Sequence, residues 1–426
     1  MKPERGDREP DRAPDGSGAQ PLRSPDSALR FRGRLAVVLS HPTQYYSPWF
    51  RWLRAHSDLE FRVFYLWDFG VTHRQDPEFG VKLTWDVDLL SGYESEFVPN
   101  RAARPGTDHF WGLRNPALNG RLAAWRPDAV LLFGYRYATH LRAIAWCRRS
   151  RVPLIFRGDS HLLGQPQPSL IKRLALRFLY RRFSAVTYVG SANRAYFEAF
   201  GVPRDRLDFA PHSVDHGLFN PRDPGHQDAA NGLREELGLT PGRRVVLFAG
   251  KMLPRKQPRS LLDAFLAAPR PDTTLIFVGD GGEKPALQTR AAQIPSADVR
   301  FLPFANQSEM PARYLLADLF ALPSQGNSET WGLAVNEAMH MEVPCLVSDV
   351  VGCQQDLVTD GETGWVFRAG DSAHLRQKLD EALAALGKDS AGFKSRVAAR
   401  IAGYTYAGTT SGLLRALAAI PPPRRS

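Results

Sequence analysis

Short apolar segments alternate with helix-like segments along two long blocks of the chain, and this alternation constrains the fold more than any other feature. The first block spans residues 34–205 and the second spans residues 244–395. Strand-like segments such as Leu35–Leu39 and Ala129–Phe133 are apolar throughout, without internal alternation. Such segments are typical of parallel strands that are buried on both faces. The sequence therefore predicts an α/β protein with two doubly wound, Rossmann-like domains that face each other across a cleft.

The segments outside these blocks lack the alternation. Residues 1–33 are rich in Pro, Gly, Asp and Arg, and we expect them to form a disordered tail because they bury too little apolar surface to fold. Residues 206–243 are rich in Gly and Pro and are expected to link the domains, and residues 396–426 are expected to form a C-terminal helix and tail. With 426 residues, each block is long enough for its own hydrophobic core.

Polar residues follow several strand-like segments of the first block, at the position where parallel sheets bind their ligands. His41 follows the first strand, and residues 157–161 follow another. Within that second stretch, Asp159 and His161 are the best catalytic candidates, because a polar group at a strand end can orient a reacting group across the cleft. A structural role is an equal alternative for His161, and His41 is the second candidate for the catalytic-side histidine.

Two glutamates, Glu329 and Glu337, bracket a segment that has the features of a ligand site. Leu319–Leu322 is expected to be a buried strand, and a helix is expected from about Leu333 to Met341. The start of this helix would direct backbone N–H groups and the positive end of the helix dipole at a phosphate above the loop. From the spacing alone, two ordinary solvated helix acids are the alternative.

The sequence around these glutamates resembles the C-terminal signature of retaining glycosyltransferase family 4, the group 1 glycosyltransferases, over the segment SETWGLAVNEAMHMEVPCLVSDVVGCQQDLVTDGETGWVF. The resemblance implies the two-domain GT-B fold. It also implies that Glu329 binds hydroxyls of the donor sugar and that Glu337 binds the ribose of the nucleotide, because they match the E-x7-E pair of the family. The residues between them are expected to line the donor site, namely Thr330, Trp331, Gly332 and Leu333.

Two lysines in the second block are candidates for binding a diphosphate. Gly250 allows a ligand to approach the backbone at the end of a strand, and Lys251 and Lys256 follow it. The resemblance places Lys251 where the family has an arginine, which keeps the charge but loses bidentate geometry, and Lys256 where the family has a lysine. Gly279 lies in a Gly-Asp-Gly turn that the resemblance places beside the nucleotide.

We expect no metal and no cofactor, with a nucleotide-diphosphate sugar as the donor substrate. Asp86-Val87-Asp88 is similar to the metal-binding Asp-x-Asp of another glycosyltransferase fold, but it follows no strand that we assign to the nucleotide site. The sequence contains no zinc-ligand spacing and no P-loop. The three cysteines also lack metal-ligand spacing and are expected to be reduced thiols of a cytoplasmic protein.

Positive charge is concentrated in one part of the first block. The formal net charge is +11, and ten basic residues but only one acid, Asp159, lie between Arg142 and Arg182. Residues 168–183 form an amphipathic pattern whose apolar residues are Leu170, Ile171, Leu174, Phe178 and Leu179. A helix that packs this apolar face on the core is the favoured interpretation. Attachment to an anionic membrane surface, where lipid-linked acceptors reside, is the alternative.

These observations predict a retaining glycosyltransferase that moves a sugar from a nucleotide-diphosphate sugar to an acceptor hydroxyl. The acceptor is expected to be a carbohydrate or a lipid-linked molecule of cell-surface polysaccharide or glycolipid synthesis. His161, Asp159, Lys256 and Glu329 are the predicted catalytic residues. No apolar run is long enough to span a membrane and no signal peptide is evident at the N-terminus. The expected location is therefore the cytoplasm, with peripheral attachment at the inner membrane face as an option.

Two other functions remain open at this point. A sugar-nucleotide epimerase or hydrolase of the same fold would use the same donor site but would need no acceptor. A basic nucleic-acid-binding protein would account for the positive charge. The basic block has few interleaved aromatic residues, however, and no nucleic-acid-binding motif is present, so we expect no nucleic-acid partner.

Overall fold

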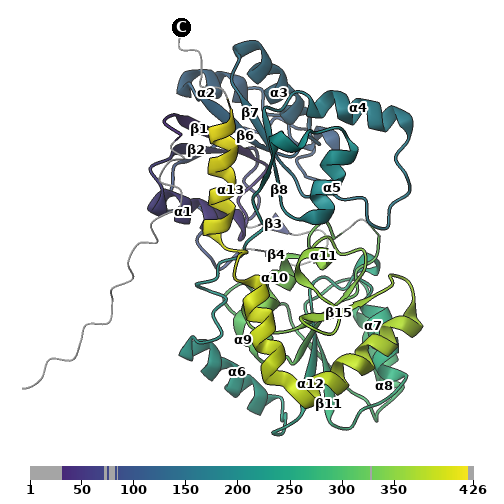
Figure 1. Cartoon of the computed structure of the whole chain (residues 1–426). Helices are drawn as coiled ribbons and strands as arrows, with labels where there is room; N and C mark the ends of the chain where they lie inside the picture. Colours follow the sequence, from purple (N-terminus) through teal and green to yellow (C-terminus); the bar gives the residue numbers. More distant parts are fainter. Residues whose placement is uncertain (1–30, 72–73, 76–81, 84, 327–328, 421–426) are drawn as a thin grey trace, which may run out of the picture.

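The computed structural model describes residues 31–71, 74–75, 82–83, 85–326 and 329–420. It contains two α/β domains, one above the other in Figure 1, and each is built on a parallel sheet covered by helices. The predicted fold class is therefore confirmed. Residues 1–30 of the tail predicted for residues 1–33 lie outside the described residues.

The first domain has a seven-stranded parallel sheet with the strand order β5-β2-β1-β6-β7-β8-β9. Its strands are β1 Arg34–Leu39, β2 Glu60–Tyr65, β5 Ser95–Phe97, β6 Ala129–Phe133, β7 Leu154–Arg157, β8 Ala185–Tyr188 and β9 Leu207–Phe209. Its helices are α1 Tyr46–His56, η1 Phe110–Gly112, α2 Leu118–Trp125, α3 Ala138–Ser150, α4 Leu170–Tyr180, α5 Ser191–Ala199 and η2 Arg204–Arg206. Between β2 and β5, a small antiparallel pair is formed by β3 Arg74–Gln75 and β4 Lys82–Leu83.

The second domain has a six-stranded parallel sheet with the strand order β12-β11-β10-β13-β14-β15. Its strands are β10 Arg244–Ala249, β11 Thr273–Val278, β12 Asp298–Leu302, β13 Leu319–Leu322, β14 Cys345–Ser348 and β15 Gly364–Phe367. Its helices are α6 Pro224–Glu236, η3 Pro254–Lys256, α7 Pro258–Leu266, α8 Lys284–Ala292, α9 Met310–Leu315, α10 Leu333–His340, α11 Gln354–Leu357 and α12 Ser372–Ile401. The last helix of the described chain is α13 Tyr406–Ala419.

Alternate residues of the central strand β1 face two separate hydrophobic cores. Leu35 and Val37 pack in a core to which α1 and α13 contribute, whereas Ala36 and Val38 pack in a core to which α2, α3, α4 and α5 contribute. All four side chains are fully buried. Because helices cover both faces of the sheet, every position of the strand has to be apolar, and the sequence therefore shows no alternation.

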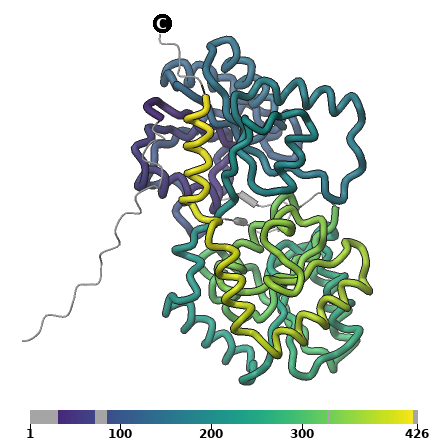
Figure 2. Tube along the Cα trace, in the orientation of Figure 1, coloured from purple at the N-terminus to yellow at the C-terminus, as the bar shows by residue number. Residues whose placement is uncertain are grey.

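Helix α13 returns from the second domain and packs on the first. Figure 2 shows the end of the chain, in yellow, running from the lower domain upward along the other. The helix places Leu413 and Leu417 in the same core as Trp49 of α1, and the indole Nε1 of Trp49 donates to Thr410 Oγ1 at 3.0 Å. Helix α13, within the segment predicted as a C-terminal helix and tail, is therefore part of the core of the first domain.

The first domain also extends beyond the boundary at residue 205 that the sequence suggested. The strand β9 pairs in parallel with β8 and is the edge strand of the first sheet. The sequence of this strand, Leu207-Asp208-Phe209, is too short and too polar to be recognised as a strand without its neighbour. The connection between the domains consequently begins after Phe209 rather than at residue 206.

Helix α4 exposes its apolar stripe, and the predicted packing of this stripe on the core is wrong. Four large apolar side chains are between 59% and 82% exposed, namely Leu170, Ile171, Leu174 and Phe178. The helix instead buries Leu176 and Tyr180. The ring of Tyr180 lies 5.6 Å from the ring of Phe156 and 5.4 Å from that of Phe197, so these aromatic contacts determine which side of the helix faces inward. None of the described helices combines the length and the apolar character needed to cross a bilayer.

We predict that Thr410→Val destabilises the first domain. Valine has nearly the same shape as threonine but leaves the buried Trp49 N–H without an acceptor, which costs about 1–3 kcal/mol of unfolding free energy. Urea denaturation followed by tryptophan fluorescence measures this difference. Ser411→Ala, one position along the same helix on a less buried side, is the control and should change stability little. Equal stability of the two variants would show that α13 is not anchored by this bond.

Candidate active site

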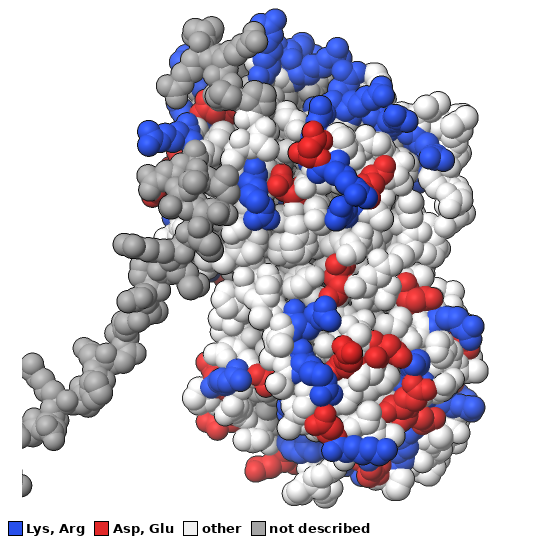
Figure 3. Space-filling view, in the orientation of Figure 1, with Lys and Arg blue, Asp and Glu red and all other residues white. Residues whose placement is uncertain are grey.

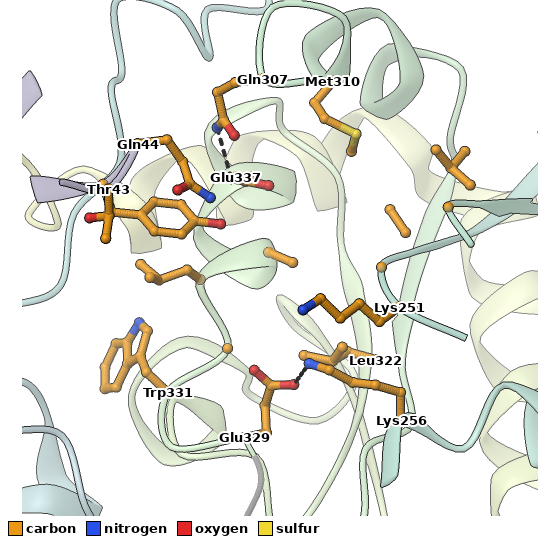
Figure 4. A pocket seen from close by; sticks show the side chains of 18 of the residues that line it. Thr43, Gln44, Lys251, Lys256, Gln307, Met310, Leu322, Glu329, Trp331 and Glu337 are labelled. Atoms are coloured by element: carbon orange, nitrogen blue, oxygen red, sulfur yellow. Dashed lines mark hydrogen bonds and ion pairs between the residues drawn. The ribbon is translucent and has the colours of Figure 1, made fainter. Parts of the chain in front are cut away.

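A cleft of about 460 Å³ lies between the two domains and contains nearly all the residues that the sequence singled out. Its lining includes twelve of the thirteen predicted site residues, namely His41, Asp159, Gly250, Lys251, Lys256, Gly279, Glu329, Thr330, Trp331, Gly332, Leu333 and Glu337. The remaining one, His161, lies behind the wall of the cleft. Figure 4 shows Lys251 and Lys256 pointing into the cleft from one side, with Glu329 opposite Lys256.

Glu329 and Lys256 form an ion pair at the floor of this cleft. Glu329 lies between β13 and α10, and Lys256 is the last residue of η3. The lysine Nζ pairs with Glu329 Oε2, and Ser324 Oγ donates to the same oxygen at 3.1 Å. The side chains of Lys256 and Glu329 are only 19% and 13% exposed. Because an unpaired charge at such a site is costly, each group stabilises the charged form of the other in the cleft.

Two glycine turns bring the backbone of the second domain close to the cleft beside Lys251. Gly250 follows β10 with φ +147°, and Gly279 follows β11 with φ +129°. A Cβ atom on Gly279 would lie 2.3 Å from the carbonyl oxygen of Gly250. The two turns therefore pack directly on each other, and only glycine fits at position 279.

The start of helix α10 opens onto the same part of the cleft. Its N-cap is Gly332, with φ +100°, and no side chain caps the first turn. A Cβ atom on Gly332 would lie 2.9 Å from Val351 Cγ1, so a capping side chain does not fit there. With Lys251 and Lys256 in the same cleft, the uncapped N–H groups form a suitable site for an anion such as a diphosphate.

Glu337 is buried and fully hydrogen-bonded, so it is not a solvated helix acid. It accepts from Gln307 Nε2 at 3.1 Å and from the Tyr314 hydroxyl at 2.8 Å. The hydroxyl of Tyr45, from the first domain, lies near enough to the same carboxylate to interact with it electrostatically. Burial raises the pKa of Glu337 above its usual value. A carboxylate held in this way is preorganised to accept hydroxyl donors.

Asp159 faces the second domain across the cleft. Its Oδ2 atom accepts from Thr330 Oγ1 at 2.8 Å and lies 3.6 Å from His212 Nε2. Burial acts to raise the pKa of Asp159, but hydrogen bonding with His212 and Thr330 holds the pKa below its usual value. The side chain is still 40% exposed, so an ionised carboxylate is available to a ligand in the cleft.

His161 holds the backbone of Glu329 instead of lining the cleft. Its Nδ1 atom accepts the N–H of Leu163 at 3.0 Å, so the ring proton lies on Nε2, which donates to the Glu329 carbonyl at 3.1 Å. The ring is buried, and this burial lowers the pKa of His161. The geometry matches the structural alternative for His161, as a residue that positions Glu329.

His41 lines the mouth of the cleft among aromatic rings. Its ring centroid lies 5.4 Å from that of Phe69 and 6.1 Å from that of Trp67, in edge-on arrangements, and Nδ1 lies 3.0 Å from Ser40 Oγ. Burial lowers the pKa of His41 to about 4. The imidazole is therefore uncharged at neutral pH.

The acids of the Asp-Val-Asp motif make hydrogen bonds within the protein. Asp86 accepts from the backbone N–H and the hydroxyl of Ser308, which belongs to the second domain. Asp88 accepts from the N–H groups of Leu90 and Ser91 and so closes a local turn. In the part of the chain that the structure describes, no group of three or more His, Cys, Asp or Glu side chains is arranged to hold a metal.

The sequence did not reveal several residues that shape the site. Gln307 and Tyr314 bind Glu337 from α9 and the loop before it, and Tyr45 reaches Glu337 from the first domain. His212 is buried beside Asp159. No local pattern marks these residues, because each is functional only through a partner that is distant in the sequence.

Both domains match known families. Residues 231–394 match the family model of the glycosyl transferases group 1, and residues 71–212 match that of the glycosyl transferase 4-like domain. The D-inositol 3-phosphate glycosyltransferase of Nocardia farcinica is 35% identical over 239 residues, which are 53% of this chain and 50% of the relative. A GDP-mannose-dependent alpha-(1-6)-phosphatidylinositol monomannoside mannosyltransferase of Mycolicibacterium smegmatis is 32% identical over 222 residues, which are 50% of this chain and 56% of the relative. The chain thus spans about half the length of these curated relatives.

Solved structures share the fold over most of the chain. Anabaena HepE in complex with UDP and glucose superposes with a TM-score of 0.65 at 18% identity, covering 89% of this chain and 98% of that chain. WaaG, a glycosyltransferase involved in lipopolysaccharide biosynthesis, superposes with a TM-score of 0.57 at 16% identity, covering 87% of this chain and 95% of that chain. At these identities the similarity shows the fold alone, which is the GT-B fold that the sequence resemblance implied.

We predict that His161 is neutral at pH 7, with its proton on Nε2. The reason is that burial lowers its pKa and that Nδ1 is already occupied as an acceptor. Long-range ¹⁵N–¹H NMR correlation spectra distinguish the two tautomers and the charged form, and His161→Gln identifies the signal. The free energy contributed by this neutral ring should be lost as pH falls below about 6.5, because the unfolded state then binds a proton that the folded state does not. A doubly protonated ring at pH 7 would contradict this assignment.

Proposed function

The chain belongs to the group 1 glycosyltransferases, and from this we propose that it moves a sugar from a nucleotide-diphosphate sugar to an acceptor hydroxyl with retention of the anomeric configuration. The observation that carries the proposal is the ion pair of Lys256 and Glu329 beside the uncapped start of α10. A cation, a carboxylate and free backbone donors are the groups that a sugar diphosphate requires, and here they lie in one cleft between two domains.

In this proposal the donor diphosphate binds between the two lysines and the start of α10. Lys256 then gains phosphate oxygens as partners, and the Glu329 carboxylate is released toward the hydroxyls of the donor sugar. Ser324 keeps the carboxylate oriented during this exchange, because it donates to the same oxygen as the lysine. Glu337 binds the ribose hydroxyls, with Gln307 and Tyr314 holding it in place.

Catalysis in this proposal rests on stabilising the departing diphosphate. Negative charge develops on the leaving phosphate in the transition state, and Lys251, Lys256 and the N–H groups of α10 are positioned to meet it. Asp159 faces the reacting sugar from the first domain and can accept a hydrogen bond from an acceptor hydroxyl. His161 contributes indirectly by holding the backbone of Glu329.

The acceptor and the cellular role are proposed from the relatives and the surface. Two similar proteins act, by their names, on D-inositol 3-phosphate and on a phosphatidylinositol monomannoside. We propose a carbohydrate or lipid-linked acceptor for this chain, in the synthesis of a cell-surface polysaccharide or glycolipid. Because the curated relatives it resembles are named glycosyltransferases, this function is favoured over the epimerase, hydrolase and nucleic-acid-binding alternatives.

A membrane surface is the proposed partner of helix α4. The exposed apolar residues Leu170, Leu174 and Phe178 recur at a spacing of four and form one stripe along the helix. Arg173, Arg177, Arg181 and Arg182 lie beside this stripe, and the Arg182 guanidinium lies 4.1 Å from the ring of Phe178. Figure 3 shows Lys and Arg side chains along the upper edge of the first domain, over α3 and α4. An apolar stripe between cations is suited to the interface of an anionic membrane.

We predict that Lys256→Ala abolishes most turnover, whereas Glu337→Ala mainly weakens nucleotide binding. The first change removes charge stabilisation of the leaving group and should lower kcat by about 100- to 1000-fold. The second removes the acceptor of the ribose hydroxyls and should weaken donor binding by about 10- to 100-fold. Calorimetry with UDP-, GDP- and ADP-linked sugars measures binding, and product formation with an acceptor measures turnover.

Two surface variants serve as controls for these experiments. Lys388→Ala and Glu236→Ala remove a lysine and a glutamate from exposed helix positions far from the cleft. They should leave donor binding and turnover unchanged. Glu337→Gln retains hydrogen bonding inside the buried site and separates lost binding from unfolding. Failure of every nucleotide sugar to bind the unmodified protein would refute the proposed function. Conversion of the donor without any acceptor would favour an epimerase or a hydrolase.

We predict that Ile171→Asp combined with Phe178→Asp reduces binding to anionic vesicles by tenfold or more. The two changes place negative charge among the exposed apolar residues of α4 and remove two of these four side chains. Cosedimentation with vesicles of phosphatidylglycerol and phosphatidylcholine measures the effect. Ala373→Asp with Ala384→Asp adds the same charge at exposed positions of α12 and should bind like the unmodified protein. Similar vesicle binding by both double variants would rule out α4 as the attachment site.

A further inference from the structure

The two walls of the cleft differ in their chemistry. The wall from the second domain carries three cations, Lys251, Arg255 and Lys256. The described residues of the first domain that line the cleft include no lysine or arginine, and they are His41, Thr43, Gln44, Tyr45, Phe69, Trp85 and Asp159. Aromatic rings make up more than half of this second group. Among the described residues, the side of the cleft opposite the proposed diphosphate site is therefore rich in aromatic rings and carries one charged group, the Asp159 carboxylate.

We infer that this wall binds an unphosphorylated sugar ring as the acceptor and selects against a phosphorylated one. The inference rests on the proposed function and specifies the acceptor class of the same site. Two observations support it. The aromatic rings of the wall are fixed by packing, and the described residues of the wall include no lysine or arginine.

The aromatic rings of this wall are held in place by packing. Phe69 stacks on Trp67 with ring centroids 4.9 Å apart, and His41 packs edge-on against Phe69. A Cβ atom on Gly70 would lie 3.5 Å from Trp85 Cδ1, so the indole lies against the backbone at this glycine, whose φ is +91°. Rings that are fixed before binding lose little conformational entropy when a ligand stacks on them.

A sugar ring complements such a surface. One face of a pyranose presents C–H groups with a slight positive charge, and the face of an aromatic ring is negative. The hydroxyls at the edge of the sugar need hydrogen-bond partners, and Asp159, Thr43 and Gln44 supply polar groups on the same wall. Asp159 is the only charged member of the wall among the described residues, and its low pKa keeps it ionised.

The same wall is unfavourable for a phosphate. A phosphate dianion requires cations or several directed N–H donors. His41 supplies no charge, because burial lowers its pKa to about 4, and Asp159 would repel the phosphate. Arg157 lies behind the wall but is buried, and its two terminal nitrogens donate to the carbonyls of Ala210 and Pro211. The cation of β7, Arg157, is therefore hydrogen-bonded to backbone carbonyls.

Five of the seven wall residues lie outside the range that matches the glycosyl transferase 4-like domain. The match to the glycosyl transferase 4-like domain begins at residue 71. His41, Thr43, Gln44, Tyr45 and Phe69 all precede it. Trp85 and Asp159 lie inside the matched range, so the acceptor preference inferred here depends on residues on both sides of its boundary.

Saturation-transfer difference NMR tests this inference without knowledge of the linkage formed. The protein is first saturated with the nucleoside diphosphate that calorimetry identifies. Methyl α-D-glucopyranoside and methyl α-D-mannopyranoside are then compared with glucose 6-phosphate, mannose 6-phosphate and D-inositol 3-phosphate. We expect at least one unphosphorylated glycoside to bind ten times more tightly than any of the phosphorylated ligands. Tighter binding of a phosphorylated ligand, or no binding of either glycoside, would overturn the inference.

Variants locate the effect on the aromatic wall. Trp85→Ala and, independently, Phe69→Ala should each weaken glycoside binding by about 3- to 10-fold and leave the Kd of the nucleotide unchanged. Trp111→Ala removes a tryptophan that is 59% exposed outside the cleft and should have no effect. Equal glycoside affinity in all three variants would overturn the inference. Failure of the proposed function is seen separately, as a lack of nucleotide binding in the calorimetric step.

Discussion

One short loop, Glu329–Gly332, is held by both domains at once, and the geometry of the cleft depends on it. Within the second domain, the Glu329 carboxylate pairs with Lys256 and its carbonyl accepts from the N–H of Gly352 at 3.2 Å. From the first domain, His161 donates to the same carbonyl, and Asp159 accepts from Thr330. The orientation of the carboxylate therefore depends on the contact between the domains, and a movement of either domain would be transmitted to the proposed site of sugar transfer.

Positive charge is unevenly distributed over this protein, and the surfaces that carry it have different proposed roles. The described cations that line the cleft belong to the second domain, whereas the basic residues between Arg142 and Arg182 lie mostly on the outer helices α3 and α4. The large positive charge of the first domain is thus directed away from the proposed sugar site. Arg157 is the exception in this stretch, because it is buried and bonded to backbone carbonyls. One domain consequently combines a basic outer surface with an inner wall whose described residues include several aromatic rings and one carboxylate.

Most of the fold follows from local pattern, because a strand buried on both faces must be apolar at every position. The strands β6 and β13 have the same bounds in the structure as the sequence predicted. Residues at strand ends were also predictable as a group, since parallel strands bring their carboxyl ends to one edge, and Asp159, Lys251 and Glu329 do meet in one cleft. The assignment of Glu329 to the donor sugar and of Glu337 to the ribose came from the family resemblance.

By itself, the sequence determined the two α/β domains, the position of the cleft and twelve of the residues that line it, because each is encoded by neighbours within one strand-loop-helix unit. Only the tertiary structure decided which face of α4 is buried, where α13 packs and what His161 does. An amphipathic helix can bury either side, and the ring of Tyr180 determined the outcome. The partner of His161 lies 168 residues away, and Tyr45 reaches Glu337 from the other domain. Contacts of this kind arise only when the chain has folded, since no local periodicity specifies them.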